Sequence, residues 1–226
     1  MTDPDDRTTP SLSPEAIELE KKVAAEAAAG LVESGMTVGL GTGSTVAYLL
    51  PALAARNLSL RCVATSPRTE DAARAVGLVV EPFDTIDRFD MTIDGADQIS
   101  PEGWLVKGGG AAHTREKIVA VSADRFVVIA DSTKTVPSIV SPIPLELLAY
   151  GLASTLRRLG PVTLRPVPAS PDGGIIADYV GPAGPPEDLA RLFETTPGVV
   201  AHGLFPPSMV SIALVARGAS VESLTF

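Results

Sequence analysis

Short apolar runs alternate with amphipathic stretches through the first half of the chain. A helix is predicted from Ser13, a hydroxyl cap followed by Pro14 and Glu15, to about Glu33. We expect further helices at 44–55, 69–76 and 114–120, and strands at 36–40, 60–65, 78–80, 90–93, 104–106 and 126–130. Strands that alternate with helices predict a parallel sheet covered by helices, whose ligands bind at the loops leaving the carboxyl ends of the strands.

The pattern changes from about Val136, where prolines interrupt the alternation. Beyond them we expect helices at 145–159 and 187–193, strands at 162–167, 174–177 and 199–201, and a last strand at 209–216 that can return to the first sheet. The predicted fold is a Rossmann-like three-layer α/β/α domain with an inserted α+β (ferredoxin-like) lobe. We assign residues 1–138 and 206–226 to the domain and residues 139–205 to the lobe, which carries no motif of its own and is expected to contact a partner subunit.

Composition excludes several classes of function. The chain of 226 residues has 18 Lys and Arg against 27 Asp and Glu, a net charge of −9 that disfavours sequence-independent binding of nucleic acid. Its one cysteine, Cys62, cannot form an internal disulfide or a thiolate zinc site, and its two histidines, His113 and His202, disfavour a histidine-ligated metal. We therefore expect no metal, although a few local cations would suffice for a small phosphorylated substrate.

No targeting or membrane segment is predicted. The first residues, 1–6, are acidic, whereas a secretory signal is basic and then apolar. The uncharged stretch 35–55 contains four glycines and Pro51, which are unsuited to a membrane-spanning helix. We expect a soluble, cytoplasmic protein without a membrane partner.

The first candidate site is a glycine-rich turn between a predicted strand and helix, from Gly39 to Thr45. Its glycines, Gly43 among them, let the backbone approach an anion, while the hydroxyls of Thr42, Ser44 and Thr45 can hold phosphate beside the free N–H groups of the helix. The turn lacks the spacing of the dinucleotide and P-loop motifs. Taken alone, it is equally compatible with a phosphate site and with a plain turn capped by Ser44.

Two carboxylates, Asp94 and Asp97, follow another predicted strand. Their position suits acid–base work on hydroxyl groups, although an Asp-Gly turn is common in its own right. A separate motif, from Asp131 to Lys134, follows another predicted strand. It is either a solvated turn or a turn that positions the charge of Lys134 at the site.

The third and least common motif begins at Lys107 and continues with three glycines, Gly108, Gly109 and Gly110. Successive glycines are entropically costly and typically present their N–H groups to a ligand. Together with the lysine they could stabilise an oxyanion. Glu116 falls in the first turn of the next helix, where it either complements the helix dipole or serves as a general base.

These motifs together resemble the A-type ribose-5-phosphate isomerases in order and spacing: Gly41–Thr45, Asp94–Asp97, Lys107–Gly110 and Thr114–Lys117. The resemblance continues through Asp131–Lys134 and covers the chain from about Lys21 onward. It implies an aldose–ketose isomerase of the non-oxidative pentose phosphate pathway that interconverts D-ribose 5-phosphate and D-ribulose 5-phosphate with no metal or organic cofactor. It also implies a homodimer or a dimer of dimers.

The resemblance also implies residue roles. Glu116 would move the proton between C2 and C1 through a cis-enediolate, stabilised by Lys107 and the glycine N–H groups. Asp94 and Asp97 would assist ring opening and proton movement between O1 and O2. The remaining predicted contacts hold the substrate phosphate: Thr42, Gly43, Ser44 and Thr45, with Lys21 and Lys134 assisting.

Three positions depart from the family pattern. Gln98 replaces an acid next to Asp97, His113 stands three positions before Glu116 where an aliphatic residue is usual, and Pro67 precedes Arg68 in an unusual pair. We expect Arg68 to reach either the substrate or only solvent. These departures bear on rate and pH dependence more than on reaction type.

Two alternative functions share the expected fold. A non-catalytic sugar-phosphate sensor domain would carry a DNA-binding head and would lack the base or the lysine, whereas this chain has only about a dozen residues before its first helix and keeps Glu116 and Lys107. Amino-sugar phosphate deamination or CoA transfer is the other alternative. The Lys107–Gly110 run and the Thr114–Lys117 helix favour the isomerase.

Overall fold

The computed structural model describes residues 12–226, so the acidic segment 1–6 lies outside the described residues. Its central sheet has six strands in the order β13-β12-β6-β3-β1-β2, parallel except for the terminal β12–β13 hairpin. The bounds of these strands are Thr37–Leu40 for β1, Arg61–Ala64 for β2, Met91–Gly95 for β3, Phe126–Asp131 for β6, Ile212–Arg217 for β12 and Ser220–Leu224 for β13. The predicted parallel sheet and the return of the last apolar run to it are confirmed.

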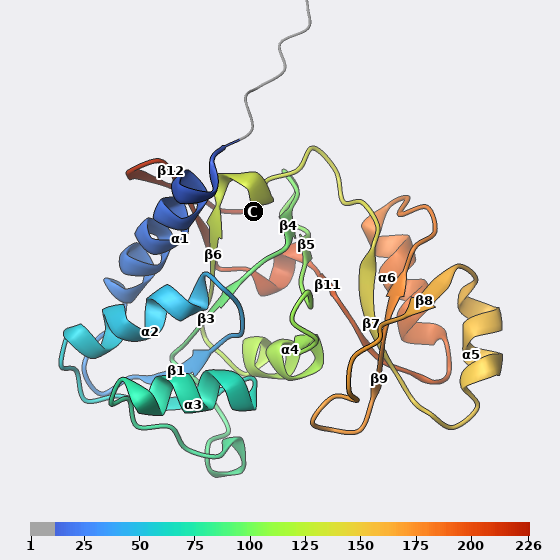
Figure 1. The fold of residues 1–226 in the computed structure, drawn as a ribbon, viewed down its shortest axis with the longest axis horizontal. Helices are drawn as coiled ribbons and strands as arrows, with labels where there is room; N and C mark the ends of the chain where they lie inside the picture. The colour runs from blue at the N-terminus through green and yellow to red at the C-terminus, as the bar shows by residue number, and fades with distance from the viewer. Residues whose placement is uncertain (1–11) are drawn as a thin grey trace, which may run out of the picture.

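Helices cover both faces of this sheet (Figure 1). They are α1 (Pro14–Ala29), α2 (Val46–Ala55), α3 (Pro67–Ala75) and α4 (His113–Val121). α1 begins at the predicted cap, because the Ser13 hydroxyl accepts a hydrogen bond from the Ala16 N–H at 3.3 Å. None of the helices within residues 12–226 combines the length and the apolar character needed to cross a bilayer.

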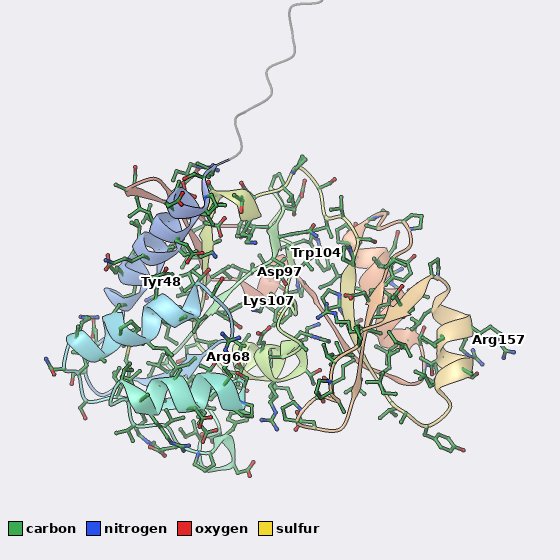
Figure 2. The ribbon with its side chains drawn as sticks, viewed as in Figure 1. Tyr48, Arg68, Asp97, Trp104, Lys107 and Arg157 are labelled. Atoms are coloured by element: carbon green, nitrogen blue, oxygen red, sulfur yellow. The ribbon has the colours of Figure 1, made fainter. Side chains whose placement is uncertain are left out.

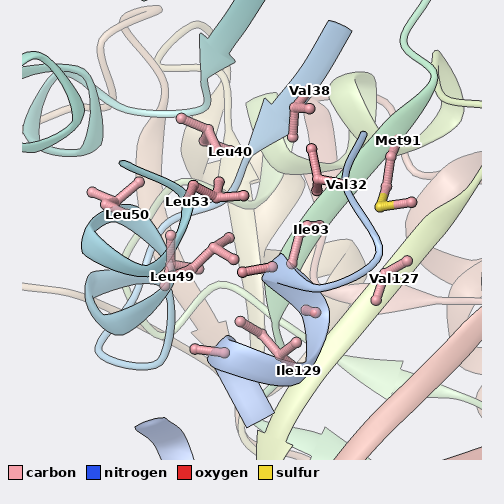
Figure 3. Packing of buried hydrophobic residues seen from close by; sticks show 14 of the residues in the cluster. Val32, Val38, Leu40, Leu49, Leu50, Leu53, Met91, Ile93, Val127 and Ile129 are labelled. Carbon is pink, nitrogen blue, oxygen red and sulfur yellow. The ribbon is translucent and has the colours of Figure 1, made fainter. Parts of the chain in front are cut away.

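Apolar side chains from α1 and α2 pack on one face of the sheet to form the largest core (Figure 3). Leu49 and Leu53 of α2 meet Val38 and Leu40 of β1 there, and all four side chains are fully buried. On the opposite face Val119 of α4 packs with Val63 and Phe89. The sheet is therefore clamped between two apolar layers, which fixes the positions of the loops at its carboxyl edge.

The segment assigned to the lobe contains a separate antiparallel sheet in the order β10-β7-β9-β8, which spans residues 143–202. Its elements are β7 (Ile143–Leu147), α5 (Leu152–Leu159), β8 (Val162–Leu164), β9 (Ile175–Tyr179), α6 (Pro186–Thr195) and β10 (Val199–His202). This βαββαβ order is that of the ferredoxin-like fold. A small third sheet joins β4 (Gln98–Ile99), β5 (Leu105–Val106) and β11 (Leu204–Phe205).

The helix predicted at 145–159 is wrong in its first part. Residues Ile143–Leu147 form β7, which lies between β10 and β9 with all five residues buried. Ile143, Leu145 and Leu147 alternate with Pro144 and Glu146 as in a strand, but a pattern this short that continues into the apolar residues Leu148 and Leu152 is also compatible with a helix. Gly151, at φ 71°, then starts the shorter helix α5.

Smaller differences have local causes. The strand predicted at 78–80 is a single bridge between Val80 and Cys62, and β8 ends at Leu164 before Pro166. The sequence did not predict β13, which is only partly apolar, or β4 and β11, which have two residues each. The first helix ends at Ala29 rather than near Glu33.

Replacing Leu53 by Ala should cost about 2–5 kcal/mol of unfolding free energy, because it leaves a cavity in the core between α2 and the sheet. The matched control is Leu19→Ala on α1, whose side chain is 49% exposed. Denaturant unfolding monitored by circular dichroism measures both. Equal losses for the two variants would contradict the packing described here.

Candidate active site

The carboxyl ends of β1, β3 and β6 open into a polar cavity of about 290 Å³. Of the predicted site residues, eleven line this cavity; they are Thr42, Gly43, Ser44, Thr45, Asp97, Lys107, Gly108, Gly109, Gly110, Glu116 and Lys134. Asp94 lies behind Lys107 rather than in the cavity wall, and Lys21 does not line the cavity. Segments far apart in sequence thus bring their chemistry to one edge of the sheet, where Figure 2 shows Asp97 and Lys107 close to the middle of the molecule.

A buried lysine between two carboxylates forms the centre of the site. The Lys107 Nζ lies 2.7 Å from Asp94 Oδ2 and 3.2 Å from Glu116 Oε2, and it donates to the Gly95 carbonyl at 2.6 Å. None of the three side chains is more than 2% exposed. The ring of Phe205 lies 5.5 Å from the same Nζ. Two carboxyl groups and one ammonium group are therefore almost completely buried together.

Burial and charge perturb each member of this cluster. Burial, with the nearby charge of Asp94, raises the pKa of Glu116 to about 8 in spite of Lys107. Burial also raises the pKa of Asp94, with Lys107 opposing it. For Lys107, burial disfavours the charge, but the two carboxylates outweigh it and raise the pKa of the ammonium. A carboxyl group that changes protonation near neutrality beside a fixed cation is suited to accept and return a proton.

The triple-glycine loop is held from two sides. The Gly109 N–H donates to Asp97 Oδ2 at 2.8 Å, and Arg165 of the lobe donates to the Gly108 carbonyl at 2.8 Å and the Gly109 carbonyl at 3.2 Å. Gly108 has φ 106°, and a Cβ there would lie 2.7 Å from the ring of His113. Glycine is therefore required for this backbone path past the histidine.

The start of α2 provides a separate, hydroxyl-rich part of the cavity. No side-chain hydrogen bond caps this helix. The N–H groups of Ala47 and Tyr48 donate to the carbonyls of Gly43 and Thr45 at 3.1 Å, and the turn that carries Ser44 and Thr45 lines the cavity. Thr42 belongs to a cluster of hydroxyls with Thr65, Ser66 and Thr69, at oxygen–oxygen distances of 2.8–3.1 Å. Such a helix start attracts an anion.

The two lysines predicted to assist phosphate binding differ in position. Lys134 lines the cavity from the turn after β6. This turn is anchored by Glu20 of α1, whose Oε2 accepts from the N–H and hydroxyl of Ser132 at 2.8 and 2.7 Å. Lys21 instead binds Glu18 on its own helix at 2.6 Å.

The positions that depart from the family pattern have distinct surroundings. The Gln98 amide exchanges two hydrogen bonds with the backbone of Val140, at 2.8 and 2.9 Å, and so ties β4 to the segment that enters the lobe. The His113 side chain is fully buried, and burial lowers the pKa of its imidazole to about 3, which keeps it neutral. Arg68 lines the cavity.

Sequence reasoning did not identify two residues that position the site, Lys117 and Arg165. The Lys117 Nζ donates to the carbonyls of His202 and Leu204 at 2.8 and 2.9 Å and lies 4.9 Å from the centre of the Phe205 ring. It joins the helix that carries Glu116 to the strand beside Lys107. Both Lys117 and Arg165 act through partners more than 50 residues away, and no local pattern marks such contacts.

No group of three or more His, Cys, Asp or Glu side chains among residues 12–226 is arranged to hold a metal ion. The described part of the site combines buried carboxyl groups, a buried ammonium, a glycine-rich loop and a helix start rich in hydroxyls. Together these suit proton transfer on a small phosphorylated molecule.

Comparisons with known proteins agree on one family. A model described as ribose 5-phosphate isomerase A (phosphoriboisomerase A) matches residues 61–219. The ribose-5-phosphate isomerase A of Caulobacter sp. (strain K31) is 42% identical over 201 residues, which cover 82% of this chain and 89% of that protein. The solved ribose 5-phosphate isomerase A from Neisseria gonorrhoeae has a TM-score of 0.88 and 27% identity, and covers 92% of this chain and 97% of its own.

A second solved structure is a D-ribose-5-phosphate isomerase in complex with phospho-erythronic acid. It has a TM-score of 0.87 and 30% identity, and the match covers 93% of this chain and 99% of that chain. The two solved neighbours therefore share the whole architecture, lobe included, and not the first domain alone.

Gly41→Ala should destabilise the protein by about 1–3 kcal/mol, because the new Cβ would lie 1.9 Å from the carboxyl carbon of Asp94. The steric conflict is with the acid that pairs with Lys107, and it cannot be relieved without moving that side chain. Denaturant unfolding measures the loss. Gly95→Ala is the control, since its Cβ would meet only the Ile129 carbonyl at 3.9 Å, and a similar loss there would contradict the steric explanation.

Proposed function

The chain belongs to the ribose 5-phosphate isomerase A family, and on this premise we propose that it interconverts D-ribose 5-phosphate and D-ribulose 5-phosphate in the non-oxidative pentose phosphate pathway. The observation that carries the proposal is the buried Lys107 between Glu116 and Asp94, at the wall of a cavity with an anion-binding helix start. The relatives are isomerases by name, and one solved neighbour binds the anionic phospho-erythronic acid. A sensor function is not favoured, because the base and the cation are both in place.

Catalysis starts with opening of the furanose ring, since the C2 proton becomes acidic only beside a free carbonyl. Asp97 faces the cavity, and we assign it the proton exchange with the ring and chain hydroxyls. Asp94 lies behind Lys107, and we assign its charge to holding the ammonium in place.

Glu116 then takes the proton from C2 of the open-chain aldose. The electron pair moves toward O1 and gives a cis-enediolate, whose negative charge faces Lys107 and the N–H groups of the glycine loop. The protonated Glu116 returns the proton to C1 while the O2 hydroxyl proton is transferred to O1, an exchange that we assign to Asp97, and this yields the ketose. The net change moves two hydrogens within one molecule, so no electron leaves it.

Two physical effects account for the acceleration. Fixed donors at a developing oxyanion are each typically worth about 2.7–4 kcal/mol, and a positioned general base contributes roughly 10²–10⁴-fold. Both effects are enlarged here because the cluster is buried, where charges interact more strongly than in water. The raised pKa of Glu116, about 8, gives a base strong enough to act and weak enough to release its proton again.

The substrate phosphate is assigned to the start of α2, with Thr42, Gly43, Ser44, Thr45 and Lys134 around it. Lys21 is paired with Glu18, so it would assist only after releasing that partner. This leaves the sugar carbons between the phosphate end and the Lys107 cluster.

We also propose that the lobe, residues 139–205, forms the contact between subunits of a homodimer or homotetramer in the cytoplasm. Large apolar side chains remain exposed on it, with Tyr150 at 93% and Leu148 at 51%. Light scattering tests this assignment, since a monomeric mass would contradict it.

The proposed activity is tested by incubating the purified protein with ribose 5-phosphate and measuring ribulose 5-phosphate, with and without EDTA. We expect turnover that EDTA does not reduce. Saturable sugar-phosphate binding without turnover would support the sensor alternative instead.

Glu116→Gln should lower kcat by at least about 10²-fold, the usual contribution of a positioned base, while sugar-phosphate binding persists. Isothermal titration with ribose 5-phosphate and a coupled rate assay measure the two quantities. The control is the exposed acid variant Glu102→Gln, which should keep full activity. Near wild-type turnover by Glu116→Gln would show that another group is the base.

The pH dependence of kcat/KM should show an acidic limb near pH 8, because burial and Asp94 raise the pKa of Glu116 to about 8. The base is active when deprotonated, so the rate should rise with pH through 8 and fall about tenfold per pH unit well below it. Initial rates at low substrate between pH 5.5 and pH 9.5 measure the limb. A limb near the ordinary pKa of a glutamate, about 4.3, would contradict the effect of burial.

A further inference from the structure

Three cations line the polar cavity: Lys107, Lys134 and Arg68. Lys107 is held between the carboxylates of Asp94 and Glu116. The Arg68 side chain makes no ion pair or hydrogen bond with the residues in the range 12–226, and the residue is exposed to solvent. A guanidinium that faces a cavity without a carboxylate is available for an anionic ligand, and its planar fork matches two oxygens of a phosphate group.

The position of Arg68 on its helix has no structural explanation. It is the second residue of α3 (Pro67–Ala75), in the first turn, where the helix dipole disfavours a positive charge. The acid of the same turn, Glu70, already binds Arg74. Neither the helix dipole nor an ion pair within the helix holds the Arg68 side chain, which leaves it available to a ligand in the cavity that it lines.

Sheet topology places Arg68 beside the phosphate end of the site. In the strand order β6-β3-β1-β2, the turn after β1 that carries Thr42 to Thr45 lies between the segment after β2, with Arg68, and the turn after β6, with Lys134. Both cations line the same cavity as this turn. Figure 2 shows the Arg68 side chain on the α4 side of α3, toward the centre of the molecule.

Arg68 also lines a second cavity next to this one. The neighbouring cavity, of about 370 Å³, lies between α3, the start of α4 and the lobe segment 167–172, and it shares Thr42, Gly43, Arg68 and Gly110 with the first. The guanidinium therefore stands where a ligand in the first cavity meets the opening toward the lobe.

We propose that Arg68 is a substrate-binding residue that contacts the phosphate group from the side opposite Lys134. This inference rests on the proposed isomerase function. Lys107 is charged but is paired with Asp94 and Glu116, so Lys134, the helix start and Arg68 are the groups left to balance a dianionic phosphate. Arg68 supplies the missing charge and a two-pronged contact, so it sets the preference for a phosphorylated sugar.

The test compares Arg68→Ala, Arg68→Lys and Lys134→Ala with the wild type in steady-state assays. Arg68→Ala should raise KM for ribose 5-phosphate about tenfold, with kcat within about twofold, because a charge-assisted contact to the phosphate is lost. The KM of Arg68→Lys should lie between those of the wild type and Arg68→Ala, since lysine keeps the charge but lacks the planar, two-pronged guanidinium. Lys134→Ala should raise KM in the same way.

Inorganic phosphate serves as the probe for the contacted group. Its inhibition constant as a competitor should rise with KM in Arg68→Ala, and the salt dependence of KM should weaken because a screened attraction has been removed. The control is Arg157→Ala on α5, an exposed arginine at the far end of the lobe (Figure 2), which removes the same charge and should change neither constant.

Three results would overturn the proposal: an unchanged KM, a raised KM with an unchanged phosphate inhibition constant, or a fall in kcat alone. Failure of the wild type to isomerise ribose 5-phosphate would instead refute the proposed function. A thermal midpoint of Arg68→Ala at or above that of the wild type shows that the variant is folded, as expected when a charge that opposes the helix dipole is removed.

Discussion

A lysine and two carboxylates buried together are the constraint around which the site is built. Each charge would be unfavourable alone in the protein interior, and the group is tolerated only because Lys107 lies within 3.2 Å of both acids. The same burial gives Glu116 a pKa of about 8 and leaves the ammonium as a fixed charge at the cavity wall. The ion pairs that make the buried cluster tolerable therefore involve the same groups that we assign to catalysis.

The backbone around this cluster has little freedom. Gly41 has no room for a side chain because Asp94 fills the space. A Cβ atom added at Gly203 would lie only 2.2 Å from the carbonyl oxygen of Lys107. The Lys107 N–H donates to the Gly203 carbonyl at 2.8 Å. Glycines at these points serve close approach of segments distant in sequence, whereas Gly108 serves an unusual backbone angle. The glycine-rich composition of the motifs thus has several separate causes.

The lobe contributes to the site as well as to the fold. Arg165, paired with Asp178 at 2.6 Å, reaches from the lobe to the glycine loop, and Lys117 ties α4 to the segment that links the lobe back to the sheet. Gln98 bonds the segment that enters the lobe. Movement of the lobe would therefore shift the glycine loop, to which we have assigned the oxyanion donors.

The sequence alone determined the parallel sheet, the order of the motifs and the family, because strand–helix alternation and glycine–acid–lysine clusters are local patterns. Of the thirteen site residues predicted from the sequence, eleven line one cavity in the structure. Tertiary structure alone decided that Lys21 pairs with Glu18, that Gln98 binds Val140, and that residues 143–147 form a doubly buried strand. It likewise decided the roles of Lys117 and Arg165. These depend on contacts between segments tens of residues apart, and such contacts are set by packing, which leaves no mark on the local pattern.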